Sequence, residues 1–410
     1  MIAASRWRSM VAAVRRALPR GAARRAHRAR AVATLGFALA ILAPLTLVVP
    51  RETVHAAPQA TTGIPATTSA GFANARFPWR FSFPRDHAAH FDFQSEWWYY
   101  TGHLRSSDGR RFGYELTFFR YGLAPGDPKP RPGQSKWRGN QVFPVHLALT
   151  DESGQRFVYD ERFAREALGM GRASDRRLEV GVDTWWVAGD SPFRMHAASS
   201  DVGLDLVQVA EKPPAVHGHD GASLKASCGT CASHYYSMTR LRTSGSLVYG
   251  GRRLRVEGIS WMDHEFGSGE LQRDQAGWDW FSIQLDDRRE LMDYRLRQKD
   301  GTLTPESSGS LVDPAGRVRY LPPEAVVVTV SGSWKSPHTG ATYPSGWRLR
   351  VPSAGLDLTL TPTVRDQELA NTAGGVSYWE GAVDVRDTAS GQRRGLGYVE
   401  LTGYAGAISL

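Results

Sequence analysis

The sequence lacks the short motifs that identify several large enzyme classes. It contains no G-x-S-x-G nucleophile elbow, no H-E-x-x-H zinc helix, no Walker phosphate loop and no G-x-G-x-x-G dinucleotide loop. Segments with helical periodicity are scarce as well, and the best short one is Glu161–Leu168. A serine hydrolase of the α/β type is therefore disfavoured both by the missing elbow and by the missing helices.

Cysteine is almost absent, since Cys228 and Cys231 alone occur, in C-x-x-C spacing. A redox motif would require a strand before the pair and a helix after it, whereas Gly, Ser and Thr surround this one. A local disulfide or two free thiols is the favoured interpretation. Zinc is the alternative, if His217 and His219 supply two more ligands. We expect no metal and no other cofactor.

An excess of one charge is also missing from most of the chain. The formal net charge is +9, but residues 1–56 hold ten arginines and one acid. The rest of the chain has 40 basic and 40 acidic residues and is neutral. A nucleic-acid partner is disfavoured, because it would require a basic surface.

Residues 1–56 have the three parts of an export signal. An arginine-rich start precedes the apolar run Ala31–Val49, and Val54-His55-Ala56 resembles a cleavage site. We expect a periplasmic or extracellular protein. An uncleaved anchor, which would keep the protein close to the membrane, is the alternative, because the run is just long enough to span a bilayer. Residues 57–72, rich in Thr, Ala and Pro, predict a flexible linker.

The chain from Phe77 onwards has the sequence pattern of an all-β protein. Short runs rich in Val, Tyr, Trp, Phe and Leu alternate with Gly, Asp-Gly and Pro-Gly turns. Many short strands at regular spacing predict antiparallel sandwiches or barrels.

Two predicted hairpins resemble each other. Each has an aromatic first strand, and each follows an Asp-His pair, Asp86-His87 in the first half and Asp263-His264 in the second. We therefore expect two tandem β-domains of similar topology, residues 73–244 and 245–410.

The densest group of acidic, imidazole and indole side chains lies between Gly258 and Asp287. Asp263, His264 and Glu265 are consecutive, and strand alternation places His264 on the opposite face from the two acids. Asp263 or His264 could transfer a proton, because burial among aromatic rings raises the pKa of a carboxyl. A buried Asp-His hydrogen bond that ties strands together is an equal alternative.

Asp279 alternates in phase with Phe281, Ile283 and Leu285. A carboxylate on such an apolar face is costly unless a partner or a reaction requires it there. Asp279 is therefore a further candidate acid.

Aromatic side chains are concentrated in both hairpins, where they are either core residues or the lining of a cavity for a lipophilic ligand. The expected lining residues are Trp97, Trp98, Tyr99, Tyr235, Trp261, Phe266, Trp278 and Trp280. Glu96 and His234 are polar candidates for the same cavity. The alternatives are a salt bridge of Glu96 with an arginine and a domain edge closed by His234. Glu380 and Glu400 lie near aromatic residues too and could also face a cavity, but pairing with surface arginines is favoured for both.

Five segments carry a resemblance to known proteins. They are Pro84-Arg85-Asp86-His87, Glu96-Trp97-Trp98-Tyr99-Tyr100-Thr101-Gly102, Thr117-Phe118-Phe119-Arg120, Ser233-His234-Tyr235-Tyr236-Ser237 and Trp261-Met262-Asp263-His264-Glu265. Together they resemble the carotenoid 1,2-hydratase/AttH-like family, and the resemblance extends from about Phe77 to Tyr404. It implies two lipocalin-like antiparallel β-barrel domains. It also implies chemistry in which an acid protonates an alkene and water captures the cation.

Within this resemblance, Asp263-His264 looks like the family's Asp-His motif. Asp293-Tyr294 is similar to a downstream Tyr/Asp pair in altered form, and Phe266 stands where a tryptophan is expected. With Asp279 added, the expected catalytic residues are Asp263, His264, Asp279 and Tyr294.

We thus expect an exported protein that binds a lipophilic small molecule. A hydratase- or lyase-type reaction on an isoprenoid- or carotenoid-like substrate is the leading hypothesis. A non-catalytic lipid or pigment carrier is the second, and an ester hydrolase without a recognisable nucleophile is the third. An enzyme should place a carboxylate in the cavity, whereas the cavity of a carrier should be apolar throughout, with Asp263 in a hydrogen-bond network. The oligomeric state is left open.

Overall fold

The computed structural model describes residues 66–126, 133, 135, 137–269, 271–370, 372 and 376–406. The expected export signal and most of the expected 57–72 linker lie outside these residues. The described end of the linker is folded rather than flexible, because Thr67 forms a β-bridge with Ala73 and the Phe72 ring is 1% exposed. Within the described residues, no helix is long and apolar enough to cross a membrane.

Runs of β-branched and aromatic residues form strands along the whole described chain, which confirms the all-β prediction. Short 3-10 turns form η1 (Arg85–His87), η2 (Pro323–Ala325) and η3 (Pro352–Ala354). The predicted helix at Glu161–Leu168 is wrong. Its first half is the end of β4 (Arg156–Arg165), which pairs with β3 (Gln141–Asp151) over its full length. Pairing with a neighbouring strand overrides a weak local helical preference.

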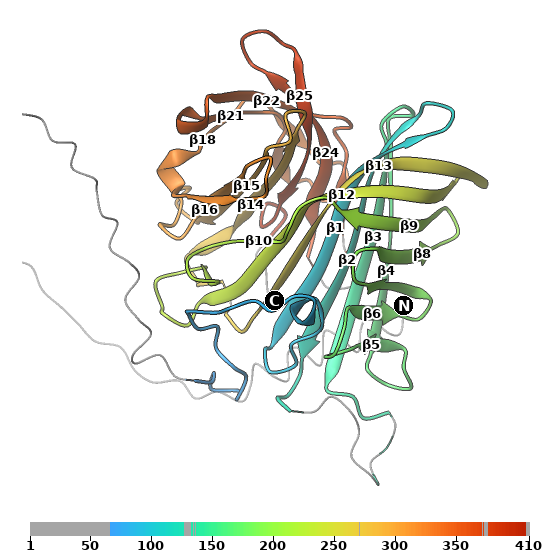
Figure 1. The fold of residues 1–410 in the computed structure, drawn as a ribbon, viewed down its shortest axis with the longest axis vertical. Coiled ribbons are helices and arrows are strands. Elements are labelled where there is room, and N and C mark those ends of the chain that lie inside the picture. Colours follow the sequence, from blue (N-terminus) through green and yellow to red (C-terminus); the bar gives the residue numbers. More distant parts are fainter. Residues whose placement is uncertain are drawn as a thin grey trace, which may run out of the picture. The chain divides into compact units, whose positions relative to one another are not determined.

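Thirteen strands form the first sheet (Figure 1), in the order β4-β3-β2-β1-β13-β12-β9-β8-β7-β6-β5, with β10 and β11 paired to β12. Its other strands are β1 (Ser95–Ser106), β2 (Arg111–Gly122), β5 (Gly171–Ala173), β6 (Glu179–Val182), β7 (Trp185–Gly189), β8 (Phe193–Ala198), β9 (Val202–Ala210), β10 (Ala215–Val216), β11 (Ser223–Leu224), β12 (Ala232–Tyr249) and β13 (Arg252–Gly267). β5 returns into contact with β3 and β4, so this sheet curls into a nearly closed barrel.

Ten strands form the second sheet, in the order β17-β16-β15-β14-β25-β24-β22-β21-β18, with β23 paired to β24. They are β14 (Gln275–Leu285), β15 (Glu290–Gln298), β16 (Ser308–Val312), β17 (Val318–Leu321), β18 (Val327–Val330), β21 (Trp347–Val351), β22 (Leu356–Pro362), β23 (Glu368–Leu369), β24 (Tyr378–Asp387) and β25 (Arg393–Leu401). A separate hairpin consists of β19 (Ser333–Lys335) and β20 (Thr342–Pro344).

The two sheets repeat one strand order. In each, the first four strands form a meander, the last strand pairs with the first strand, and the penultimate long strand follows. The two hairpins that resemble each other in sequence are β1–β2 and β14–β15. The Asp-His pairs do not correspond, because Asp86-His87 lies in η1 whereas Asp263-His264 lies within β13.

The chain passes from the first sheet to the second between β13 and β14. The expected boundary between residues 244 and 245 falls inside β12, so β12 and β13 belong to the first sheet. The physical reason is that β13 pairs with β1 along the whole of β1, from Ser95 opposite Gly267 to Ser106 opposite Val256. Pairing between strands so far apart in sequence leaves no trace in local composition.

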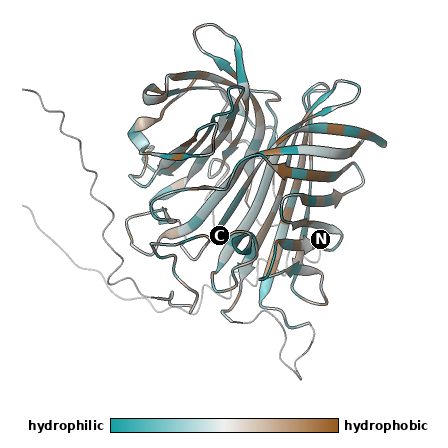
Figure 2. Ribbon diagram, in the orientation of Figure 1, coloured by the Kyte–Doolittle hydropathy of each residue, from teal (hydrophilic) through white to brown (hydrophobic). Residues whose placement is uncertain are grey.

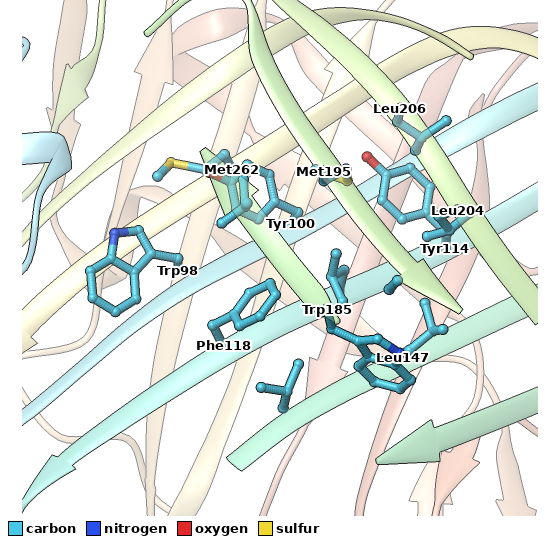
Figure 3. Packing of buried hydrophobic residues seen from close by; sticks show 14 of the residues in the cluster. Trp98, Tyr100, Tyr114, Phe118, Leu147, Trp185, Met195, Leu204, Leu206 and Met262 are labelled. Atoms are coloured by element: carbon cyan, nitrogen blue, oxygen red, sulfur yellow. The ribbon is translucent and has the colours of Figure 1, made fainter. Parts of the chain in front are cut away.

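Each sheet buries an apolar core of its own. In the first sheet the core contains Trp98, Tyr100 and Tyr114 (Figure 3). In the second, alternation along β14 sends Phe281 and Ile283 into the core. Hydrophilic and hydrophobic residues are accordingly interspersed along the strands (Figure 2). The intervening residues of β14 join a third cluster, which contains Tyr99, Tyr235, Trp261, Trp280 and Tyr294 from both sheets.

Leu349 tests the assignment of the second core. It is fully buried on β21, and Leu349→Ala is expected to lower the free energy of unfolding by about 2–5 kcal/mol, because truncation leaves a cavity. Val330 on the neighbouring strand β18 is 51% exposed, and Val330→Ala should change this free energy by less than about 0.5 kcal/mol. Urea unfolding of the two variants measures both effects, and equal losses would contradict the assignment.

Candidate active site between the two sheets

A cavity of about 110 Å³ lies where the outer faces of the two sheets meet. Alternate residues of β1, β2, β12 and β13 reach it from the first sheet, and residues of β14, β15, β24 and β25 reach it from the second. The lining includes Trp97, Tyr99, Glu115, Phe119, Tyr121, Lys225, Tyr235, Asp263, Glu265, Leu271, Trp278, Trp280, Tyr294, Tyr378 and Glu400. Acidic and aromatic side chains therefore dominate its surface.

Asp263 is held in this cavity by a network that joins the sheets. Its carboxylate accepts hydrogen bonds from the Tyr235 hydroxyl at 2.7 Å, from Trp261 Nε1 at 2.6 Å and from the Ser237 hydroxyl. The Tyr235 oxygen in turn accepts a hydrogen bond from Trp280 Nε1 of the second sheet at 3.0 Å. Burial raises the pKa of Asp263 to about 7, although these hydrogen bonds act in the opposite direction. Asp263 can therefore hold a proton near neutral pH.

Three glutamates form a second acidic group, Glu115 on β2, Glu380 on β24 and Glu400 on β25. Tyr99 donates a hydrogen bond to Glu380 Oε1 at 2.6 Å, and Tyr378 donates one to Glu115 Oε1 at 3.1 Å. Burial raises the pKa of Glu115 to about 7. Burial and the neighbouring carboxylates raise the pKa of Glu400 to about 8 and that of Glu380 well above its usual range.

Lys225 contributes a cation to the lining. Its ammonium lies 2.6 Å from Glu265 Oε1 and 4.2 Å from the centre of the Tyr294 ring. Its backbone N–H donates to the Cys231 carbonyl at 2.7 Å, beside the short loop that the Cys228–Cys231 disulfide closes. The disulfide interpretation is thus confirmed, and the zinc alternative is wrong because the two sulfurs are bonded to each other.

Glu96 and His264 turn away from the cavity, into the interior of the first sheet. Glu96 Oε2 accepts a hydrogen bond from Arg120 Nε at 2.8 Å. Glu96 Oε1 lies 2.9 Å from His264 Nε2 and 2.9 Å from His90 Nδ1. Burial acts to raise the pKa of Glu96, yet Arg120 and the two imidazoles hold it well below its usual value. The salt-bridge interpretation of Glu96 is confirmed.

His90, Glu96 and His264 are also the group of three potential metal ligands found within the described part of the chain. Their ligand atoms already bond to one another, and Glu96 is shared with the fully buried Arg120. A metal ion would lie close to that guanidinium, and the repulsion between two buried cations is strong. The three residues fit a hydrogen-bond network better than a metal site.

The structure divides the predicted site residues into two sets. Those at the cavity are Trp97, Tyr99, Tyr235, Asp263, Trp278, Trp280 and Tyr294, with Trp261 joined to it through Asp263. Those that do not line it are Glu96, Trp98, His234, His264, Phe266 and Asp279. Alternation explains the division, because consecutive strand residues cannot face the same side.

Asp279 is a predicted catalytic residue that lies away from the cavity. It points away from Trp278 and Trp280, and its Oδ1 bonds to Arg297 Nε at 2.8 Å and to the Tyr404 hydroxyl at 3.0 Å. The partner that justifies its burial is therefore a structural arginine, and Asp279 does not share a site with Asp263.

Glu115 and Lys225 were not predicted from the sequence. For Glu380 and Glu400 the less favoured of the two interpretations, a position at a cavity, agrees with the structure. Glu115 carried a usable signal, since it alternates with the apolar Tyr114 and Leu116 in an aromatic strand, as Asp263 does in its own strand. Lys225 carried none, because it lies outside any long strand.

The raised pKa values of Glu115 and Glu400 predict that stability falls as the pH rises. Above the usual carboxyl pKa the unfolded chain releases protons that the folded protein still holds. Each pH unit up to about 7 or 8 then costs up to about 1.4 kcal/mol per group. Glu115→Gln should remove part of this slope and exceed the wild type in stability at about pH 8. Urea unfolding across this pH range measures the slope, with the exposed Glu211→Gln as control; an unchanged slope in Glu115→Gln would contradict the assignment.

Comparisons with known proteins agree with this architecture. The AttH-like family model matches residues 74–404. An AttH-type protein from Nitrosomonas europaea is similar in structure, with a TM-score of 0.72, 32% sequence identity, and coverage of 81% of this chain and 100% of the other. Kievitone hydratase from Nectria haematococca shares the fold, with a TM-score of 0.61, 15% identity, and coverage of 83% and 97%. No curated protein matches the sequence. On the extent of these matches, the chain belongs to the AttH-like family.

Proposed function

We propose that this protein adds water to an isolated C=C bond of a lipophilic molecule, or catalyses the reverse elimination. The observation that carries the proposal is the carboxyl of Asp263, which faces an aromatic cavity with a pKa raised by burial to about 7. Such a group is protonated often enough near neutral pH to act as a general acid. That one protein of the same fold bears the name of a hydratase supports the same reaction class.

In the proposed hydration, the Asp263 proton passes to one alkene carbon, directly or through the Tyr235 hydroxyl bonded to it. A C–H bond forms as the π bond breaks, and positive charge develops on the other carbon. The rings of Trp278 and Trp280 and the new Asp263 carboxylate stabilise this charge. Water then adds its oxygen to the cation, and the proton that water loses returns to the Asp263 carboxylate, which restores the acid.

The lining favours an enzyme over a carrier. Glu115, Asp263, Glu265 and Glu400 line the cavity, whereas a carrier was expected to have an apolar lining throughout. The cavity volume of about 110 Å³ suits only the reacting end of an isoprenoid-like molecule. We further infer, from the signal-like residues 1–56, that the protein acts after export.

Asp263→Asn is the direct test of this proposal. The amide keeps the shape of the side chain but has no acidic proton to transfer, so turnover should fall about 10²–10⁴-fold while ligand binding persists. Isoprenoid alkenes of increasing length are incubated with the exported protein in heavy-oxygen water, and mass spectrometry detects the label in an alcohol product. Native mass spectrometry of the same samples reports binding.

Asp205→Asn is a matched control, because Asp205 lies at the surface of the first sheet beside His196 and Arg253. It should turn over substrate at the wild-type rate. Labelled product from Asp263→Asn at the wild-type rate would refute the role of Asp263. Recovery of the same unmodified lipophile from the wild type and from both variants would identify a carrier.

A further inference from the structure

The cavity between the sheets holds more acids than it has counter-charges for. The acids at or immediately behind its surface are Glu115, Asp263, Glu265, Glu380 and Glu400. Among the described residues the cation that lines it is Lys225, which is already paired with Glu265 at 2.6 Å. The other carboxyls have no cationic partner in the cavity, and their ionisation in a buried site is therefore costly.

Two of these carboxyls also have an unused oxygen. The Oε2 atoms of Glu115 and Glu380 form no hydrogen bond with any described residue, although both side chains are 0% exposed. A buried polar atom without a partner costs about 1–3 kcal/mol, and natural proteins keep few of them. Glu115 is also one of the residues that line the cavity.

The walls around these acids are aromatic faces. Tyr99, Tyr235 and Trp280 are buried in the cavity wall, and Trp97 and Trp278 are half-buried nearer its rim. Lys225 already shows how such a wall receives an ammonium group, since its Nζ lies over the Tyr294 ring. Aromatic faces combined with carboxylates are the usual protein site for alkylammonium groups.

We propose that this cavity is a binding site for lipophilic organic cations, in which Glu115 and Glu400 provide the counter-charge and the aromatic rings enclose the charged head. The volume of about 110 Å³ accommodates a head the size of trimethylammonium. An apolar tail leaves past the half-buried Phe119, Tyr121 and Leu271. The inference deepens the proposed function, because a carbocation formed in hydration carries the same charge at the same place. The test of the cation site measures binding and requires no turnover, so the cation site and the proposed hydration can fail separately.

Binding of a cation should strengthen as the pH rises, because it requires ionised acids. The groups that ionise in the relevant range are Glu115, Asp263 and Glu400, each with a pKa raised by burial to about 7 or 8. Burial and the neighbouring carboxylates also raise the pKa of Glu380 well above its usual range. The phenols of Tyr99, Tyr235, Tyr294 and Tyr378 stay neutral because burial raises each pKa, and His146 behind Tyr378 stays neutral because burial lowers its pKa to about 4. Lys225 and Glu265 also line the cavity, where they form an ion pair.

The experiment compares benzyltrimethylammonium with neopentylbenzene, its uncharged carbon isostere, by titration calorimetry on the wild-type protein. The ammonium ion is expected to bind at least roughly tenfold more tightly at about pH 8, and the gap should narrow at about pH 5.5. Near neutral pH the ammonium ion should release protons on binding, measured as a dependence of the heat on the ionisation enthalpy of the buffer. These readouts need no variant and so do not depend on a variant folding.

Glu115→Gln and Glu400→Gln should each reduce the affinity for the ammonium ion and leave that for neopentylbenzene unchanged, while the surface control Glu211→Gln changes neither. Equal affinity for the two compounds, or binding of the ammonium ion without proton release, would overturn the cation site. Selective binding of the ammonium ion together with no hydration of any alkene would uphold the cation site and remove the proposed function. Hydration of an alkene without a preference for the ammonium ion would uphold the proposed function and remove the cation site.

Discussion

The structure depends on one constraint, the alternation of side chains across two curved sheets that each fill their own interior. Residues such as Trp98 and Phe281 complete the two interiors, so their sequence neighbours must face outward. Where the outer faces meet, those neighbours are enclosed as well. The acids and aromatic residues between the sheets are thus buried only because the two sheets pack together. On either sheet alone they would lie at the surface.

Burial of this kind explains the common direction of the pKa shifts at the cavity. Asp263, Glu115 and Glu400 lie on different strands and have different hydrogen-bond partners, yet the pKa of each is raised by loss of water. Glu96 shows the contrast. It is equally buried, but Arg120 and two imidazoles supply the charge and the donors that keep it ionised. The three acids of the cavity lack such a cationic partner and hold their protons to a higher pH.

Much of the fold could be predicted from the sequence, because alternation, turn residues and the repeated hairpins are local. Asp263, Tyr235 and Trp280 could be found for the same reason, as polar or aromatic residues out of place in apolar strands. The partners of His264 and Asp279, which are Glu96 and Arg297, could not be identified without the strand register. Glu115 and Lys225 were missed because their neighbours at the cavity come from both sheets, and local patterns do not show which faces of two sheets will meet. The same limitation placed the domain boundary inside β12.

The position of β13 bears on how the protein is made. β1 is among the first strands to emerge from the ribosome, but the strand that covers its second edge comes only after all the others of its sheet. Until then the backbone of β1 exposes a long row of unpaired N–H and C=O groups, which can pair with another chain. One edge of β14 likewise stays unpaired until β25 is made, near the end of the described chain. Each half of the molecule therefore remains open to strand exchange with other copies until its last strand arrives, and the cavity forms only after both have closed.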